Sequence, residues 1–252
     1  VLRDRLRQDG YLYLTGHLDP WVVMSFREFY FTKMAETGLL DSRQAPMEGI
    51  GAPGAIDRSK IREILYGDIV PGPEYEALTT QPEIRDWFEW FFDEPVHLHR
   101  RKIIRHIRPG EDGIGTATQA HYDLLYLRGG SDDVLSMWIP LGDCSVEMGG
   151  LTYLEGSHHW TMADEDEHVM YRPAGWMTAN LPSLADTHDS RWLLANYKAG
   201  DVVVHSSYIV HAGTDNVDPG NRLRLSTDIR YQRSSEEIDQ RWQKDWHEND
   251  GL

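Results

Sequence analysis

The sequence is poor in cysteine, in basic residues and in long apolar stretches. Cys144 is the only cysteine, which excludes an intrachain disulfide framework and a cysteine-rich metal site. Asp and Glu number 41 against 25 Lys and Arg, and the formal net charge of −16 disfavours nucleic acids and anionic membranes as partners. No signal peptide or membrane-spanning run is recognisable, so we expect a cytoplasmic protein. Because the chain begins at Val1, we also expect its natural N-terminus to lie upstream.

The composition is that of a folded protein with a large core. Nine Trp, twelve Tyr and six Phe accompany a hydrophobic fraction of 40%, which excludes a disordered chain. The 252 residues contain no internal repeat and no linker-like segment. The sequence therefore predicts a single domain over residues 1–252.

The first part of this domain, residues 1–95, is predicted to be mainly helical. Asp19-Pro20 is typical of a helix start, with a capping aspartate before a proline in the first turn. The aromatic-rich segment 82–92 predicts an amphipathic helix. Residues 41–60, rich in Gly, Pro and Ala, predict an ordered loop or lid.

The middle of the chain, residues 96–232, changes to short apolar runs separated by turn signals such as Gly129-Gly130. Several short strands behind a helical layer predict a mainly β protein with flanking helices (α+β), in which two sheets form a jelly-roll core. The last segment, 233–252, combines a serine cap with early acidic and later basic residues, and it predicts a closing helix.

Candidate metal ligands lie in two of the strand-like runs. In AHYDLLY, His121 and Asp123 are two positions apart, so they project from one face of a strand. Such a pair can form a salt bridge, a catalytic pair or two ligands of one metal. His211 near the end of GDVVVHSSYIVHAG is a third ligand candidate, and two imidazoles with one carboxylate leave positions open on Fe(II). Because the chain has twelve His, spacing by itself does not separate this site from ordinary exposed or hydrogen-bonded histidines.

A strand rich in arginine follows the distal histidine. Arg222, Arg224 and Ser226 alternate onto one face of this strand. A planar guanidinium beside a hydroxyl is suited to bidentate binding of a carboxylate. The alternative is a sheet surface on which arginines pair with acidic neighbours such as Asp228.

From His121 to Ser226 the chain resembles the phytanoyl-CoA dioxygenase family of non-haem Fe(II)/2-oxoglutarate oxygenases. The matching segments are HYD, MWIPLGDCSVEMGGLTYLEGSHHW, AGDVVVHSSYIVHAGTDN and the arginine-bearing strand, in that order. The resemblance implies a double-stranded β-helix core in which His121, Asp123 and His211 bind Fe(II). It also implies 2-oxoglutarate as the cosubstrate.

The resemblance further implies which residues bind 2-oxoglutarate. The family's arginine stands about eleven residues after the distal histidine, which favours Arg222. Arg224 is the alternative, because it forms an Arg-x-Ser pair with Ser226. Trp138 stands where a tryptophan lines the cosubstrate site in the family, and Arg105 lies on a strand from which it could reach the C1 carboxylate.

Four further residues are predicted to surround a substrate. Tyr126, His205 and Ser207 share the inner face with the metal ligands, and Met47 belongs to the possible lid. The predicted reaction converts 2-oxoglutarate and O2 to succinate and CO2 while a C–H bond of a small organic molecule is hydroxylated. A zinc-dependent hydrolase on the same ligands and a non-catalytic jelly-roll binding protein stay open as alternatives.

Overall fold

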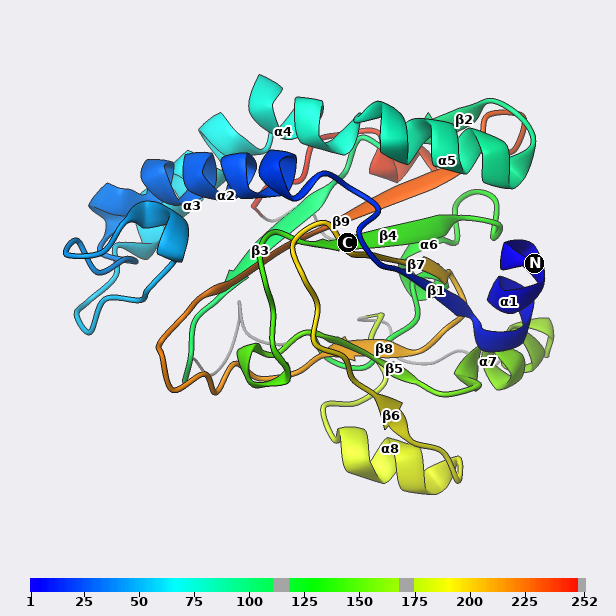
Figure 1. The fold of residues 1–252 in the computed structure, drawn as a ribbon. Coiled ribbons are helices and arrows are strands. Elements are labelled where there is room, and N and C mark those ends of the chain that lie inside the picture. The colour runs from blue at the N-terminus through cyan, green and yellow to red at the C-terminus, as the bar shows by residue number, and fades with distance from the viewer. Residues whose placement is uncertain (111–117, 168–174, 249–252) are drawn as a thin grey trace.

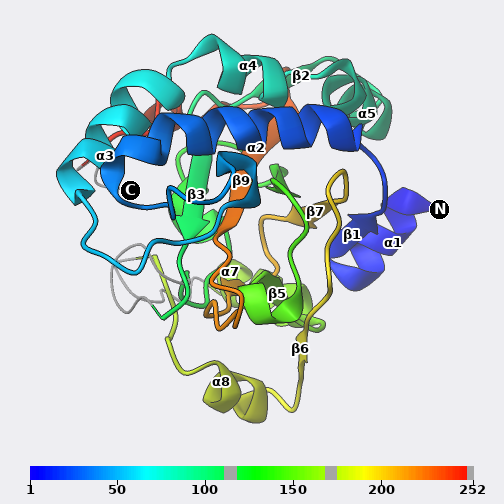
Figure 2. The ribbon, with the colours of Figure 1, turned by 60° about the vertical axis from the view of Figure 1, so that its left-hand side comes forward.

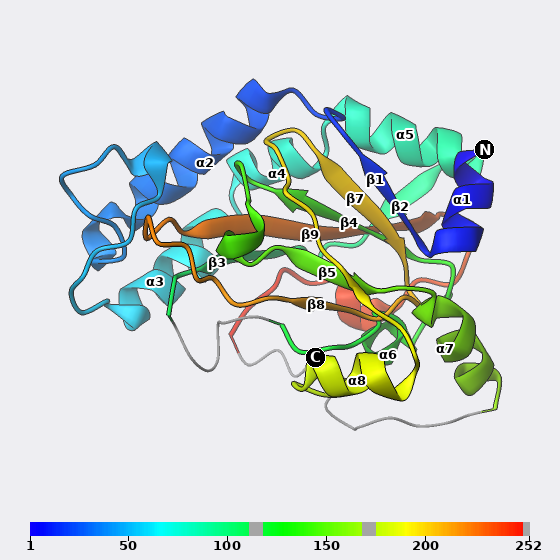
Figure 3. The same cartoon turned by 60° about the horizontal axis from the view of Figure 1, so that its bottom comes forward.

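The computed structural model describes residues 1–110, 118–167 and 175–248, which form two antiparallel sheets with a helical layer (Figure 1). The larger sheet lies between a layer of helices from the first third of the chain and the smaller sheet, as the views in Figures 1 and 3 agree. This arrangement confirms the predicted mainly β fold with flanking helices.

Helices from the first third of the chain cover the outer face of the larger sheet (Figure 2). They are α2 (Pro20–Met34), α3 (Arg58–Ile64), α4 (Pro73–Thr79) and α5 (Pro82–Phe92), with a π-helical turn, η3 (Leu65–Ile69), after α3 and short 3-10 turns η1 (Ala35–Thr37) and η2 (Pro46–Glu48). Helix α1 (Leu2–Asp9) lies beside the edge of this sheet (Figures 1 and 2). Helix α2 starts as predicted, because the Asp19 side chain accepts a hydrogen bond from the Trp21 amide at 2.8 Å. Helix α5 matches the predicted segment 82–92.

All strand pairs are antiparallel, and the two sheets draw their strands from distant parts of the chain. In the larger sheet the order is β1-β7-β4-β9-β2, and β3 also pairs with β9. In the smaller sheet the order is β6-β5-β8. The strands are β1 (Tyr11–Leu14), β2 (Val96–Leu98), β3 (Ile103–Ile107), β4 (Leu135–Pro140), β5 (Leu151–Leu154), β6 (Trp192–Leu193), β7 (Val202–Ser206), β8 (His211–Gly213) and β9 (Arg224–Arg233).

Strand β9 separates the main hydrophobic core from the space between the sheets. Its odd-numbered residues face the helices: the Thr227 hydroxyl lies 2.6 Å from the Tyr75 hydroxyl, and Tyr231 stacks on Phe88 with ring centroids 4.4 Å apart. Side chains alternate along a strand. The even-numbered residues over Arg224–Arg230 therefore face the smaller sheet.

Phe88→Ala is expected to destabilise the protein by about 3–5 kcal/mol, because it removes a fully buried ring from the contact between α5 and β9. Urea denaturation followed by circular dichroism measures this loss. Trp90→Ala on the same helix is the matched control, since Trp90 is 58% exposed and its removal is expected to change stability by less than about 1 kcal/mol. Equal losses in the two variants would contradict this account of the core.

Two predicted strands are interrupted, and both interruptions lie at the candidate site. The segment 120–126 is not a strand: only Ala120 and His121 form isolated bridges, and helix α6 (Leu124–Leu127) follows at once. The segment 200–213 is not one strand either, because a turn after Ser206 sends its two halves, β7 and β8, into different sheets. Pairing with distant segments has overridden the local pattern in both places.

The predicted C-terminal helix is also wrong within residues 233–248, where the structure has only the short 3-10 turn η5 (Gln240–Trp242). The side chain of Trp242 is 2% exposed there and packs with Ile103, Leu127 and Val134, so a tertiary contact holds this segment. The remaining helices are α7 (Ser157–Asp166), α8 (Leu181–Thr187) and the 3-10 turn η4 (Val146–Met148). Within the described residues, no helix is both long and apolar enough to span a membrane.

Candidate functional site

The two histidines of the candidate triad are brought together by backbone pairing between segments 90 residues apart in the chain. The His121 amide donates to the His211 carbonyl at 3.0 Å, and the His211 amide donates back at 2.8 Å. The two imidazole centroids consequently lie 4.3 Å apart. Asp123 follows at the start of α6, where the Leu124 amide is anchored on the Ser207 carbonyl at 2.9 Å.

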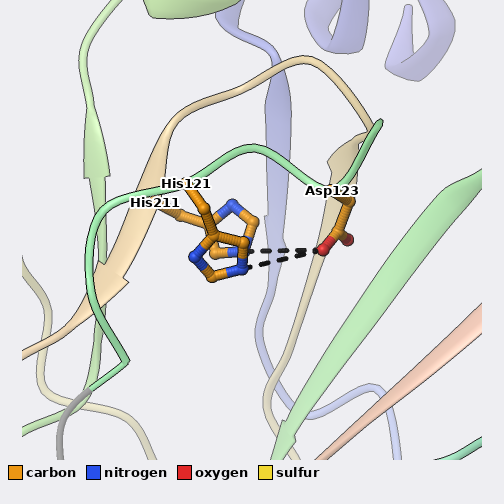
Figure 4. A group of neighbouring side chains, drawn as sticks. All are labelled: His121, Asp123 and His211. Atoms are coloured by element: carbon orange, nitrogen blue, oxygen red, sulfur yellow. Dashed lines mark ion pairs between the residues drawn. The ribbon is translucent and has the colours of Figure 1, made fainter. Parts of the chain in front are cut away.

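The three side chains point toward one another (Figure 4). The Nε2 atoms of His121 and His211 are each 3.9 Å from Oδ1 of Asp123, and the three ligand atoms all lie within 4.8 Å of one another. All three residues are buried. Each of the three side chains is directed toward the other two, as the predicted facial triad requires (Figure 4).

Both imidazoles are held in the form that binds a metal. Nδ1 of His121 lies 2.7 Å from the Gln119 carbonyl, and Nδ1 of His211 lies 3.0 Å from the Ile209 carbonyl. A neutral imidazole that donates its Nδ1 proton to a carbonyl presents an unprotonated Nε2 to the metal. Burial lowers the pKa of both histidines, which favours the neutral form.

The carboxylate of Asp123 is fixed by three neighbours. Nη2 of Arg230 donates to Oδ1 at 2.8 Å, the Ser136 hydroxyl donates to Oδ2, and Nε2 of His205 lies 3.3 Å from Oδ2. Although burial opposes ionisation, the Arg230 guanidinium holds the pKa of Asp123 well below its usual range. The group is therefore a charged ligand with a fixed orientation.

Arg230→Met is expected to destabilise the protein by about 3–5 kcal/mol, because the Asp123 carboxylate would be left buried without its cation. Urea denaturation of the metal-free protein measures the effect. Arg191→Met is the control: Arg191 is 74% exposed and pairs with Glu155 at the surface, an ion pair worth about 0–1 kcal/mol. A loss for Arg230→Met no larger than that of the control would mean that this ion pair does not hold Asp123.

Four of the residues predicted to bind 2-oxoglutarate lie in one cavity with the triad. This cavity has a volume of about 110 Å³, and Arg105, Trp138, Arg224 and Ser226 line it on the side of the larger sheet. Arg222 is not among the described lining residues. Its side chain is 50% exposed and donates to the Asp218 carboxylate through both Nε and Nη2.

Arg224 is a buried cation that lines the cavity. It is 4% exposed, Nη1 donates to the Gly149 carbonyl, and Nε has no hydrogen-bond partner among the described residues. Burial lowers the pKa of Arg224, yet a guanidinium stays charged at neutral pH. A buried cation with a free donor calls for an anionic ligand.

The residues predicted to surround the substrate divide into two groups. Tyr126 lines the cavity, and its ring lies edge-on to His121 with centroids 5.5 Å apart. His205, Ser207 and Met47 are not among the described lining residues. His205 lies behind Asp123, Ser207 donates to the Asp132 carbonyl at 2.6 Å, and the Met47 carbonyl accepts from Arg27 at 2.8 Å.

Sequence reasoning missed five polar or aromatic residues of the described cavity lining: Arg101, Thr118, Asp228, Arg230 and Trp242. The alternation that places Arg224 and Ser226 on one strand face continues to Asp228 and Arg230 in RLSTDIR. The sequence pattern could therefore have indicated Asp228 and Arg230. No local pattern indicates Arg101 or Trp242. They reach the cavity because the Arg101 amide bonds to the Trp242 carbonyl at 3.0 Å, far along the chain.

A family model for phytanoyl-CoA dioxygenase (PhyH) matches residues 6–223. The chain belongs to the phytanoyl-CoA dioxygenase family. It is therefore an Fe(II)/2-oxoglutarate-dependent oxygenase, and its two histidines and aspartate form the expected metal-binding group. This membership confirms the resemblance and replaces the zinc-hydrolase and binding-protein alternatives.

Relatives of this oxygenase include proteins with different reactions. The 1-deoxypentalenic acid 11-beta-hydroxylase of Streptomyces arenae is 27% identical over 235 residues, covering 90% of this chain and 79% of the relative. EctD from S. alaskensis, solved with 2-oxoglutarate and 5-hydroxyectoine, matches with a TM-score of 0.64 and 18% identity over 94% of this chain and 77% of its own. The epimerase SnoN, solved with Fe3+, alpha ketoglutarate and nogalamycin RO, matches with a TM-score of 0.62 and 20% identity over 94% and 84%.

The two solved structures confirm the fold as the double-stranded β-helix of 2-oxoglutarate oxygenases. Iron and 2-oxoglutarate, the cofactors predicted from the sequence, are those of the family, and both are bound in SnoN. The described residues of this oxygenase carry the ligand set that such an iron requires.

Proposed function

We propose that this oxygenase hydroxylates an unactivated C–H bond of a small organic molecule, with Fe(II) held by His121, Asp123 and His211. The observation that carries the proposal is the convergence of two Nε2 atoms and one carboxylate oxygen on a point in a buried cavity. Two neutral nitrogen ligands and one charged oxygen ligand suit Fe(II) and leave coordination positions open. Hydroxylation is favoured over halogenation because Asp123 occupies the coordination position that a halide would need, while 2-oxoglutarate and O2 take the positions that the three side chains leave open.

We assign the distal carboxylate of 2-oxoglutarate to Arg224 rather than to Arg222, which the sequence spacing favoured. Arg224 is buried in the cavity, and its Nε has no hydrogen-bond partner among the described residues. Arg222 is half exposed and already forms an ion pair with the Asp218 carboxylate. Ser226 stands two positions further on the same strand face and supplies a hydroxyl donor. The indole of Trp138, 2% exposed, provides an apolar wall for the cosubstrate's methylene groups.

When bound, iron and 2-oxoglutarate supply the oxidising chemistry: O2 converts 2-oxoglutarate to succinate and CO2, and one oxygen atom enters the substrate. The protein's own residues orient and shield these reactants. Ser136, His205 and Arg230 hold the Asp123 carboxylate, and carbonyls hold both imidazoles. Such support from outside the ligand set determines how tightly and in which geometry the metal binds. Ile103 and Leu151 add apolar surface to the cavity lining.

The test is to load the purified protein anaerobically with Fe(II), add 2-oxoglutarate, admit O2, and measure succinate and CO2. Substrates are then found by screening small molecules for those that increase succinate release and gain one oxygen atom by mass spectrometry. The proposal predicts Fe(II)-dependent succinate formation that is coupled to a product heavier by one oxygen. Products formed by ring closure or epimerisation, without that oxygen, would overturn hydroxylation while preserving the family assignment.

A further inference from the structure

The metal-binding side chains are held from both sheets. His211 lies on β8 of the smaller sheet, and the His121 backbone pairs with it there. The groups that hold the Asp123 carboxylate come from three strands of the larger sheet: Ser136 on β4, His205 on β7 and Arg230 on β9. The geometry of the metal site therefore depends on how the two sheets are spaced at this point.

Tyr153 connects the two sheets beside the metal ligands. It lies on β5 of the smaller sheet, directly opposite His211 on β8, and its side chain is buried. The Tyr153 hydroxyl lies 2.9 Å from Nδ1 of His205, which belongs to the larger sheet. The Tyr153 ring stacks on Tyr11 with centroids 5.0 Å apart, and Tyr11 lies opposite His205 on the neighbouring strand β1. Packing and hydrogen bonding together fix the position of this hydroxyl.

His205 transmits the position of this hydroxyl to the carboxylate. Nε2 of His205 lies 3.3 Å from Oδ2 of Asp123 and forms no hydrogen bond with any other described residue. Because a carboxylate only accepts hydrogen bonds, this approach is attractive when Nε2 carries the ring hydrogen. In that neutral tautomer Nδ1 is an acceptor, and the Tyr153 hydroxyl donates to it. Burial raises the pKa of Tyr153 well above its ordinary value, so the hydroxyl keeps the proton that it donates.

We propose that Tyr153 is a positioning residue of the metal centre, which acts through His205 on the direction of the Asp123 carboxylate. Groups that support a ligand from outside the ligand set orient it and strengthen metal binding. Without the Tyr153 hydroxyl, the His205 ring is free to turn or to change its tautomer, and a lone pair on Nε2 would then face the carboxylate. This inference rests on the proposed function, because it takes Asp123 as a metal ligand.

The test is Tyr153→Phe, which removes one hydroxyl and retains the ring that stacks on Tyr11. We expect the Kd for Fe(II), measured by anaerobic equilibrium dialysis, to rise about tenfold or more, as is typical when a supporting group is lost. The visible absorption bands of bound Co(II), which report the geometry of the ligands, are expected to shift as well. In a His205→Leu background, Tyr153→Phe should weaken metal binding no further, because the hydroxyl acts through that imidazole.

The matched control is Tyr197→Phe. Tyr197 is buried in the same hydrophobic cluster as Tyr153, and its hydroxyl donates to the Leu151 carbonyl at 2.9 Å. This variant should leave the Fe(II) affinity and the Co(II) bands unchanged.

Three results would overturn the inference. One is an unchanged Fe(II) affinity in Tyr153→Phe, and another is an equal loss in Tyr197→Phe, which would indicate a general effect of losing a buried hydroxyl. The third is a full further loss when Tyr153→Phe is added to His205→Leu. The proposed function fails in a different way, because the unmodified protein would then bind no Fe(II), and the inference would fail with it.

Discussion

Asp123→Ala is expected to abolish turnover and to reduce Fe(II) affinity by more than about 100-fold. Loss of a residue that only supports a ligand typically costs 10–100-fold in metal affinity, and Asp123 is itself the charged ligand. Its removal also leaves the Arg230 guanidinium buried without a counter-charge. Succinate release and equilibrium dialysis against Fe(II) measure the two effects.

A second ligand variant separates metal loss from unfolding. His211→Ala removes a ligand but preserves the Asp123–Arg230 ion pair. This variant should therefore lose metal binding and turnover, while its free energy of unfolding stays closer to that of the unmodified protein than the free energy of Asp123→Ala does. Asp143→Asn is the matched carboxylate control, since Asp143 pairs with Lys198 at the surface. This variant should leave succinate release and Fe(II) affinity unchanged. Full hydroxylation by the Asp123 variant would place the charged ligand elsewhere.

Arg224→Ala is expected to weaken 2-oxoglutarate binding by about 2–5 kcal/mol, which is roughly 30-fold or more in Kd. The reason is that the cosubstrate's distal carboxylate would be buried without a partner in the cavity that Arg224 lines. Arg222→Ala should change this Kd little, because the Arg222 side chain is 50% exposed and forms a surface ion pair with Asp218. Anaerobic titration of the Fe(II) protein with 2-oxoglutarate, followed by the visible absorption of the complex, gives both constants.

The pair of variants distinguishes the two arginines without depending on the substrate. Arg224→Lys retains the charge but not the planar fork, so we expect an intermediate affinity. A larger effect at Arg222 than at Arg224 would restore the assignment that the spacing from His211 favoured. If neither alanine variant weakens 2-oxoglutarate binding, the site proposed for the cosubstrate is wrong.

Local sequence patterns were sufficient for the elements that depend on near neighbours in the chain. The capping aspartate and proline predicted the start of α2, and the aromatic period predicted α5. The spacing of an HxD pair and a distal histidine suggested the three metal-ligand candidates, but only the resemblance to the family separated them from the other histidines of the chain. Alternation along β9 likewise separates the residues that face the helices from those that face the cavity.

Tertiary structure decided the matters that depend on contacts between distant segments. Arg222 precedes the first residue of β9 and folds back on Asp218, so the spacing rule selected a residue outside the strand. Asp123 reaches the metal site from the start of a helix and not from a strand, because Leu124 is anchored on Ser207. The segment expected to be a terminal helix instead buries Trp242 beside Arg101 and Arg230. For Asp123 and Trp242, burial and pairing with a remote partner outweigh a local preference worth only fractions of a kcal/mol per residue. Arg222 is instead held by Asp218, only four residues earlier in the chain.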